Sequence, residues 1–174
     1  ETAHAFGLAG VMINIISDYG LDPEWGTLGS NAPEHLARVK ALLDKYNMYC
    51  EIATKGIGYD HLVKVLDVAE AIGADIIRTY IPITLNCSAD RKTGGEGKYD
   101  LGKIRLDFDP AVFDDAAESL RKIIPELQKR RIKIGLENHE YETSEELVNV
   151  IKEINSPWIG LHYDFGNSMM AWEE

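Results

Sequence analysis

Long apolar runs, long basic blocks and metal-type cysteine spacings are missing from this chain of 174 residues. No apolar run approaches the roughly 18 residues that a membrane-spanning helix needs, and no charged leader followed by an apolar core opens the chain, so we expect no membrane partner. Eighteen basic against 29 acidic residues give a net charge of -11 without a basic block, which argues against a nucleic-acid partner. Cys50 and Cys87 match no zinc or redox spacing, which fits structural thiols in a cytoplasmic protein.

The remaining composition, 45% hydrophobic and 27% charged, is that of an ordinary globular protein, and the length suits one domain over residues 1–174. Short apolar runs alternate with amphipathic helical patterns. We expect buried strands at residues 11–16, 49–54, 75–81, 132–136 and 159–161. We expect helices at residues 33–46, 60–72, 109–131 and 144–154, with the end of another at residues 2–9. Strict alternation of this kind predicts a parallel sheet with helices outside, and the spacing fits (β/α)8 barrel units of about 30 residues.

Several local signals set the helix boundaries. Pro33 is a favoured first-turn residue, Gly73 is a typical C-terminal stop, and Thr143 to Glu146 has the form of a capping box. The helix after Asp109 is expected to turn an apolar stripe inward, made of Phe113, Ala117, Leu120, Ile124 and Leu127. The polar, glycine-bearing segment between residues 82 and 109 lies on the strand-to-helix side, and its residues 86–105 are predicted to form a lid over the strand ends.

Chemically competent side chains follow the last two predicted strands. Alternation along a strand puts Glu137 with His139, and His162 with Asp164, on common sides at the two carboxyl ends. A single Glu or His at a strand end is usually a solvated loop residue. Two such pairs on adjacent parallel strands point instead to a metal or acid/base site, because ligands bind at this edge of parallel α/β proteins. Arg78, near the end of the third predicted strand, is a candidate for holding a carboxylate, a phosphate or a neighbouring Glu.

The motifs Gly135-Leu136-Glu137-Asn138-His139 and His162-Tyr163-Asp164-Phe165-Gly166-Asn167 resemble the sugar phosphate isomerase/epimerase superfamily, whose members are xylose isomerase-like TIM barrels. The resemblance implies that Glu137 binds a divalent metal and moves protons, and that Asp164 is a second metal ligand. It implies substrate contacts for Asn167 and His139, and His162 and Arg78 are further candidates for substrate binding. Mn, Mg, Co or Zn would suit these ligands, with Mn or Mg favoured by oxygen-rich ligation.

The same resemblance implies a partial barrel of about five parallel strands, in which the first, seventh and eighth strands of the family have no counterpart. Two further metal ligands of the family, a His and a Glu, belong to those last strands. An open barrel exposes two sheet edges, which proteins avoid. We therefore expect the chain to be an excerpt of a longer protein. Completion of the barrel by another chain, as in a homo-oligomer, is the alternative.

The predicted function is a metal-dependent isomerase or epimerase of a sugar, sugar phosphate or sugar acid, acting by proton abstraction next to a carbonyl through an enediolate. One alternative is a dehydratase of the inosose or 3-dehydroshikimate type, which uses the same metal and base. Another is the DNA-binding endonuclease branch of the fold, which the acidic composition disfavours. A third, from a different class, is a non-catalytic module that binds metal or sugar. For the isomerase and the dehydratase, the expected small-molecule partner is a carbohydrate substrate.

Overall fold

The computed structural model describes residues 1–15, 25–82, 111–139 and 142–170. Its strands are β1 (Gly10–Asn14), β2 (Tyr49–Ala53), β3 (Ile76–Thr79), β4 (Lys133–Glu137) and β5 (Ile159–His162). Its helices are α1 (Thr2–Ala5), the 3-10 helix η2 (Gly26–Leu28), α2 (Pro33–Lys45), α3 (Tyr59–Ile72), α5 (Ala111–Arg130), α6 (Ser144–Ile154) and α7 (Phe165–Met170). The predicted lid, residues 86–105, lies outside the described residues, as do Cys87 and Asp109.

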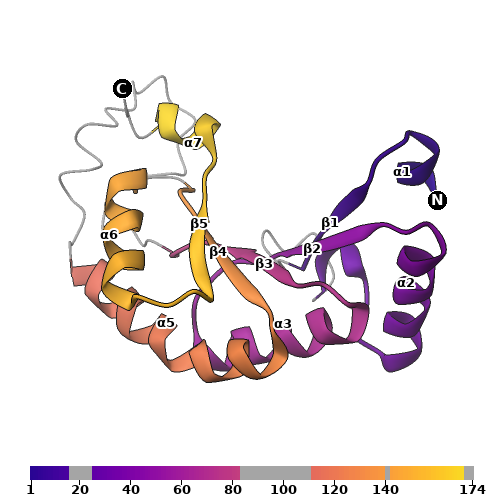
Figure 1. Ribbon diagram of the computed structural model, residues 1–174, viewed down its shortest axis with the longest axis horizontal. Helices are drawn as coiled ribbons and strands as arrows, with labels where there is room; N and C mark the ends of the chain where they lie inside the picture. The colour runs from indigo at the N-terminus through magenta and orange to yellow at the C-terminus, as the bar shows by residue number, and fades with distance from the viewer. Residues whose placement is uncertain (16–24, 83–110, 140–141, 171–174) are drawn as a thin grey trace, which may run out of the picture.

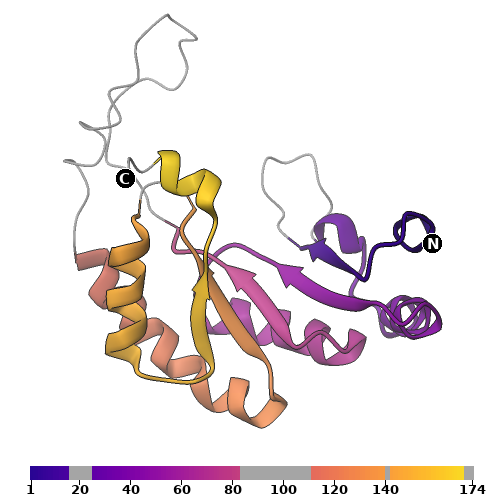
Figure 2. The same cartoon turned by 45° about the horizontal axis from the view of Figure 1, so that its top comes forward.

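All five strands are parallel, and their order in the sheet follows the chain from β1 to β5. One continuous row of register partners crosses the whole sheet: Asn14, Ala53, Arg78, Gly135 and Gly160. Figure 1 shows the sheet as a curved trough with α2, α3, α5 and α6 on its outer side, and the turned view in Figure 2 shows the same curvature. The predicted fold, a partial barrel of five parallel strands, is confirmed.

The two faces of the sheet differ in character because side chains alternate along each strand. The face toward the helices carries the apolar core, with Ile52, Ile77 and Leu136 completely buried. The concave face is mixed: Met12 and Tyr49 are exposed there, and Arg78 and Glu137 stand beyond them toward the carboxyl edge. Burying the helix-facing row stabilises the layer by about 1.5–3 kcal/mol per large apolar side chain.

The four long helices α2, α3, α5 and α6 lie where they were predicted, whereas η2 and α7 were not predicted, and two of the five residues in the expected apolar stripe of α5 are only partly buried. α3 ends at Gly73, whose φ of +79° is the left-handed stop that glycine adopts without strain. α5 buries Ala116 and Ile123 beside the predicted Ala117, Leu120 and Leu127. The predicted Phe113 and Ile124 are only partly buried at its side, since α5 packs against both α3 and α6 and its buried face is turned toward the two contacts together.

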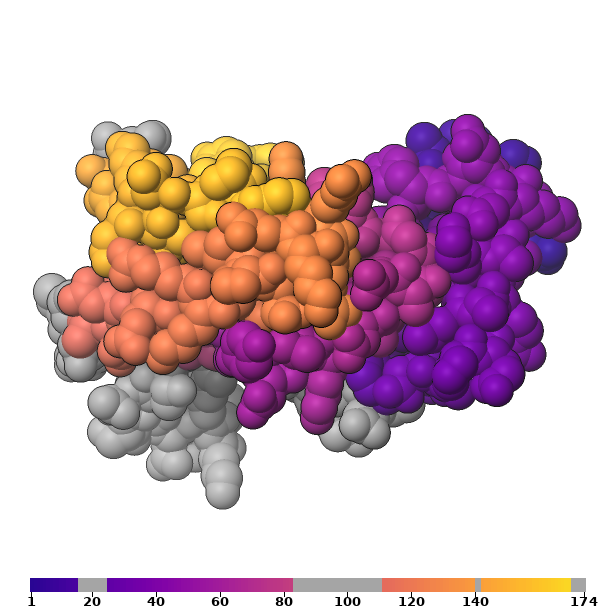
Figure 3. Space-filling model, turned by 60° about the horizontal axis from the view of Figure 1, so that its bottom comes forward, coloured from indigo at the N-terminus to yellow at the C-terminus, as the bar shows by residue number. Residues whose placement is uncertain are grey.

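Charged side chains join neighbouring helices on the outer face, where α2, α3 and α5 lie one after another (Figure 3). The Arg130 guanidinium of α5 donates to Asp67 at 2.6 Å and to Glu70 at 3.0 Å, both on α3. Arg121 of α5 donates to Glu153 of α6 at 2.7 Å. None of the helices within the described ranges is long and apolar enough to cross a bilayer.

The capping box predicted from sequence opens α6. The Glu146 N–H donates to Thr143 Oγ1 at 3.2 Å, and the Thr143 N–H donates to Glu146 Oε2 at 2.7 Å. Two N–H groups that the helix itself cannot satisfy therefore have partners. The box fixes where the chain turns from the end of β4 into α6.

Replacing Thr143 by Ala is expected to lower the free energy of unfolding by about 1 kcal/mol, because the Glu146 N–H loses its acceptor. Urea denaturation followed by circular dichroism measures the change. Thr143→Ser, which keeps the hydroxyl, is the matched control and should stay close to the parent. Equal losses in the two variants would show that the hydroxyl is not what stabilises the helix start.

Cys50 of β2 faces the helices and is 3% exposed. Burial, with a smaller contribution from the neighbouring Glu51 carboxylate, raises the pKa of its thiol to about 11. The thiolate is the reactive form of cysteine, so the thiol is chemically inert in the folded protein. The predicted structural role of Cys50 agrees with this burial.

In a Cys87→Ser background, the Cys50 thiol is expected to react with Ellman's reagent at pH 8 more than about 100-fold more slowly in the native protein than in denaturant, since both access and thiolate fraction are lost. Absorbance of the released thionitrobenzoate at each denaturant concentration gives the rate. Labelling of the native protein as fast as the unfolded one would contradict the burial of this side chain.

Candidate active site

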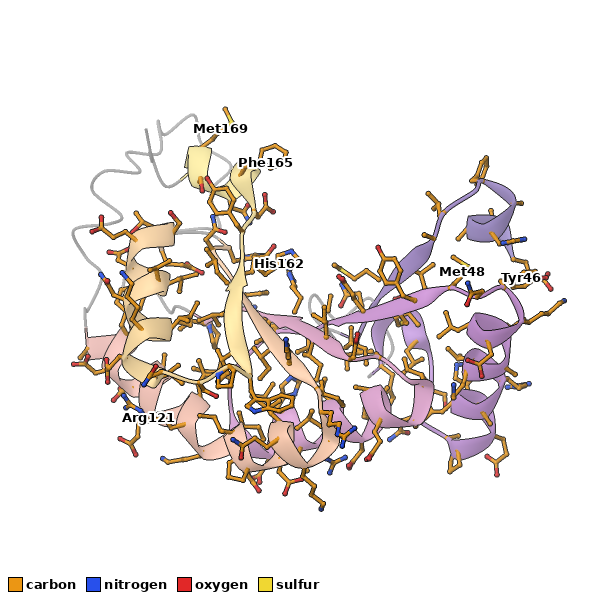
Figure 4. All side chains as sticks on the ribbon, viewed as in Figure 1. Tyr46, Met48, Arg121, His162, Phe165 and Met169 are labelled. Atoms are coloured by element: carbon orange, nitrogen blue, oxygen red, sulfur yellow. The ribbon has the colours of Figure 1, made fainter. Side chains whose placement is uncertain are left out.

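The carboxyl ends of β3, β4 and β5 bring all six predicted site residues to one edge of the sheet. Arg78 lies in β3, and Glu137 and His162 are the last residues of β4 and β5. His139 and Asp164 follow these two strands by two residues each, and Asn167 lies in α7. Figure 4 shows His162 projecting from β5 over the concave side of the sheet.

Glu137 and Arg78 form a buried ion pair across neighbouring strands. The Arg78 guanidinium contacts Glu137 Oε2, and the two side chains are only 14% and 4% exposed. Gly135, the register partner of Arg78, has no side chain on the concave face and leaves the Arg78 side chain free to extend toward Glu137. A buried carboxylate needs a cation or donors to offset its desolvation, and Arg78 supplies the cation. Of the partners considered for Arg78, the structure shows the neighbouring Glu.

His162 is placed beside Glu137 by the sheet itself. The two residues are Cα partners in the β4–β5 ladder and therefore share the concave face. Gly135 also makes room here, because a Cβ at that position would lie 3.1 Å from the His162 Cβ. Glu137 and His162 are thus adjacent at the strand ends, and the partly buried imidazole stays open to the concave side.

The His139 ring stacks on the ring of Tyr80, with centroids 3.8 Å apart and an 8° angle between planes. The Arg78 guanidinium carbon and Lys55 Nζ lie 5.3 and 5.9 Å from the centre of the same tyrosine ring. The backbone N–H of His139 donates to Glu142 Oε1 at 2.9 Å, and Glu142 is buried. His139 is thereby held in one orientation at the end of β4.

Sequence reasoning missed three of these neighbours. Tyr80 was given no role from sequence, although strand alternation puts it on the same face as Arg78 at the end of β3. Lys55 lies two residues after Ala53, the last residue of β2, and the row that joins Ala53, Arg78 and Gly135 puts it level with Tyr80 and Glu137; strand alternation and parallel order were the available signal. Glu142 lies in a short loop without periodicity, and its contact with His139 had no signal in the sequence.

Asp164 caps the short helix that follows β5. Its Oδ1 accepts from the Gly166 N–H at 2.8 Å and from the Asn167 N–H at 3.3 Å, and its Oδ2 accepts from Asn167 Nδ2 at 3.1 Å. Asn167, predicted to contact substrate, therefore contacts the predicted metal ligand in this structure. Its role toward substrate stays a prediction.

Asn138, inside the first motif but given no role from sequence, joins the two strand ends. It is completely buried, and its carboxamide bonds to the backbone of Asp164 and to Ser168 Oγ. Its partners lie 26 and 30 residues further along the chain. The sequence alone could not reveal such a contact without the register of β4 and β5.

The donor chemistry of this edge suits a divalent metal, and the number of donors is small. One carboxylate oxygen of Glu137 is paired with the Arg78 guanidinium, and one of Asp164 accepts from N–H groups at the start of α7, so both carboxylates are oriented as ligating carboxylates commonly are. Across the described ranges, no group of three or more His, Cys, Asp and Glu side chains could hold a metal ion. The two carboxylates thus fit a metal in kind, and additional ligands would have to come from water or from elsewhere in the protein.

Replacing Arg78 by Met is expected to cost about 3–5 kcal/mol of unfolding free energy, because the buried Glu137 carboxylate loses its cation. The double variant Arg78→Met with Glu137→Gln should recover part of this loss. Lys40→Met, which breaks a solvent-exposed pair with Asp44, is the control and should cost less than about 1 kcal/mol. Urea denaturation of each variant measures the loss of unfolding free energy. Equal losses for Arg78→Met and Lys40→Met would contradict the buried ion pair.

Comparison with known proteins agrees with this geometry. The sequence model of the family described as xylose isomerase-like TIM barrel matches residues 1–174. A curated protein of Pectobacterium atrosepticum, 3-oxo-isoapionate decarboxylase, is 25% identical over 150 residues, which are 86% of this chain and 46% of that protein. The chain spans about half the length of this curated relative.

Solved structures share the fold. A D-psicose 3-epimerase, solved in the presence of D-fructose, superposes with a TM-score of 0.70 at 10% identity and covers 100% of this chain and 59% of its own. A xylose isomerase-like TIM barrel protein from Mycobacterium smegmatis, in complex with magnesium, gives 0.57 at 21% identity, covering 95% and 55%. The resemblance predicted from the two strand-end motifs is confirmed: the chain belongs to the xylose isomerase-like TIM barrel family.

Proposed function

We propose that the protein is a divalent-metal-dependent isomerase or epimerase of a sugar, sugar phosphate or sugar acid, which moves a proton on the carbon next to a carbonyl. The observation that supports this most directly is Glu137: a buried carboxylate on the concave face, at the carboxyl edge where this fold places active sites, with one oxygen held by Arg78. A carboxylate held in this way is oriented for proton transfer.

In this proposal Glu137 takes the proton from the substrate carbon and returns it to the same or the neighbouring carbon. Arg78 holds Oε2, so the remaining oxygen, Oε1, is the one that faces substrate. Burial at 4% exposure keeps bulk water from competing for the proton. A bound divalent ion, Mn, Mg, Co or Zn, held by Glu137 and Asp164, would supply positive charge to stabilise the oxyanion that forms as the proton leaves.

The histidines of the site are proposed to orient the substrate. His162 lies beside Glu137 in register, and His139 is fixed by its stack on Tyr80, so both imidazoles are within the same strand-end group as the base. Imidazole nitrogens donate to or accept from sugar hydroxyls equally well. Asn167 and Arg78 complete the proposed substrate-binding set, Arg78 through its hold on Glu137.

A second candidate is decarboxylation of a 3-oxo sugar acid, favoured by the name of the Pectobacterium relative and by the two cations, Arg78 and Lys55, around Tyr80. In that reaction the bond to the carboxylate breaks, its electrons pass into the oxo group, carbon dioxide leaves, and a proton is added to the carbon. A dehydratase shares the first proton abstraction and then expels a β-hydroxyl. Isomerase, dehydratase and decarboxylase therefore share an enolate-type oxyanion, while a non-catalytic module does not form one.

One experiment separates these functions. The full-length gene product, incubated in D2O with ketoses and 3-oxo sugar acids and with Mn²⁺ added, is followed by proton NMR for deuterium entry and product formation. Deuterium next to the carbonyl with an isomeric product supports the isomerase, loss of water the dehydratase, and released bicarbonate the decarboxylase. Metal binding without exchange or turnover across the substrate panel supports the module.

Glu137→Gln is expected to lower turnover and deuterium exchange by about 100-fold or more, because the amide cannot accept the proton. Glu51→Gln is the matched control, since Glu51 also lies on the concave face but in register with the start of β3, away from the carboxyl edge. It should keep the parent rate in the same NMR assay. A Glu137→Gln variant with unchanged exchange would exclude Glu137 as the base.

A further inference from the structure

The side chain of Asn138 pairs with the backbone of Asp164 at two points. Asn138 Nδ2 donates to the Asp164 carbonyl oxygen at 2.8 Å, and the Asp164 N–H donates to Asn138 Oδ1 at 2.8 Å. Nδ2 also donates to Ser168 Oγ at 3.0 Å. Only a carboxamide offers the donor and the acceptor side by side, so an Asp, a Ser or an apolar residue cannot make the same pair.

These bonds extend the sheet beyond its last backbone rung. The β4–β5 ladder ends with the pair Glu137 and His162, and the Asn138 carboxamide then takes the place that a further strand residue would occupy. Asn138 directly follows Glu137 in the chain. A short path of bonds, through the completely buried Asn138, therefore runs from the proposed base to the backbone of Asp164.

Asn138 does not itself face the concave side. Alternation puts Glu137 and His139 on that side and Asn138 on the opposite one, where it meets Ser168 of α7. The residue thus acts on the site through Asp164. Because it is 0% exposed and makes three bonds, its own orientation is fixed.

The Asp164 carboxylate is held independently from its other end. Gly166 and Asn167 donate to it, and a Cβ at Gly166 would lie 3.1 Å from Asp164 Oδ1. With its backbone held by Asn138 and its carboxylate by the start of α7, Asp164 has little freedom to move relative to Glu137. Outer residues that orient a ligating carboxylate in this way typically change metal affinity when they are replaced.

We propose that Asn138 is a positioning residue that sets the place of Asp164 relative to Glu137, and so the geometry in which the two carboxylates bind a divalent cation. The binding of a cation by the two carboxylates rests on the proposed function. The positioning of Asp164 by Asn138 rests only on the hydrogen bonds between them. It assigns to the middle residue of the Glu-Asn-His motif a task distinct from substrate contact or proton transfer.

The test uses the full-length gene product with Asn138→Ala and the nearly isosteric Asn138→Asp, which loses both donated bonds. Isothermal titration with Mn²⁺ should show affinity weakened about 10- to 100-fold in both variants. Hydrogen exchange should show the Asp164 amide exchanging at least about tenfold faster. In Asn138→Ala the Asp164 N–H loses its acceptor. In Asn138→Asp a carboxylate oxygen replaces Nδ2 and faces the Asp164 carbonyl oxygen, and the repulsion between the two oxygens separates the pair. Thr143→Ala, which weakens a helix start of the same β4–α6 connection, is the control for lost stability and should keep the parent Mn²⁺ affinity.

The outcomes separate the two proposals. Unchanged Mn²⁺ affinity in both Asn138 variants, with measurable binding by the parent, would overturn the positioning role. If the parent binds no Mn²⁺, the proposed function fails, and the Asp164 amide then decides: faster exchange there, with protection of the α3 core unchanged, supports positioning, and unchanged exchange overturns it. If Asn138→Ala does not fold, Asn138→Asp and Ser168→Ala carry the same measurements, the latter with a smaller expected effect because one bond is lost.

Discussion

The parallel register of the five strands is the constraint on which the structure depends. Since every strand runs in the same direction, every strand ends at the same edge, and a residue's parity in its strand decides whether it joins the apolar core or the concave face. Ile77 and Leu136 take one side, and Arg78 and Glu137 take the other. A shift of one residue in the β3–β4 pairing would move Arg78 away from Glu137 and bury a charge among the helices.

The electrostatics of the site run against those of the chain as a whole. The protein carries a net charge of -11, yet Glu137 is buried beside an arginine, and a second cation, Lys55, stands nearby around Tyr80. Excess acid on the outer surface remains hydrated and costs little, as with Asp67 and Glu70, which also pair with Arg130. A buried acid is tolerated only with a specific partner, as Glu137 has in Arg78 and Glu142 has in the backbone N–H of His139, and this separates the two from the exposed acids of the outer surface.

Sequence was sufficient where the cause is local. The capping box at Thr143, the stop at Gly73 and the five strands each follow from residues a few positions apart. It was also sufficient to place Glu137, His162 and Arg78 together, because strand alternation and parallel order carry their side chains to a common edge. It was insufficient where two distant segments meet: the Asn138–Asp164 pairing, the Glu142 contact with His139, and the turn of α5 toward Ile123 depend on packing that no single segment encodes.

The row Asn14, Ala53, Arg78, Gly135 and Gly160 also governs how readily the site can change during evolution. It forms the layer just below Glu137 and His162 on the concave face, and Arg78 is its one long side chain. A Cβ added at Gly160 would meet no atom within 4 Å among the described residues, whereas a Cβ at Gly135 would lie 3.1 Å from the His162 Cβ. New bulk can therefore enter this layer under β5 without disturbing the ion pair, which leaves one route for altering the shape of the concave face while the Arg78–Glu137 pair is kept.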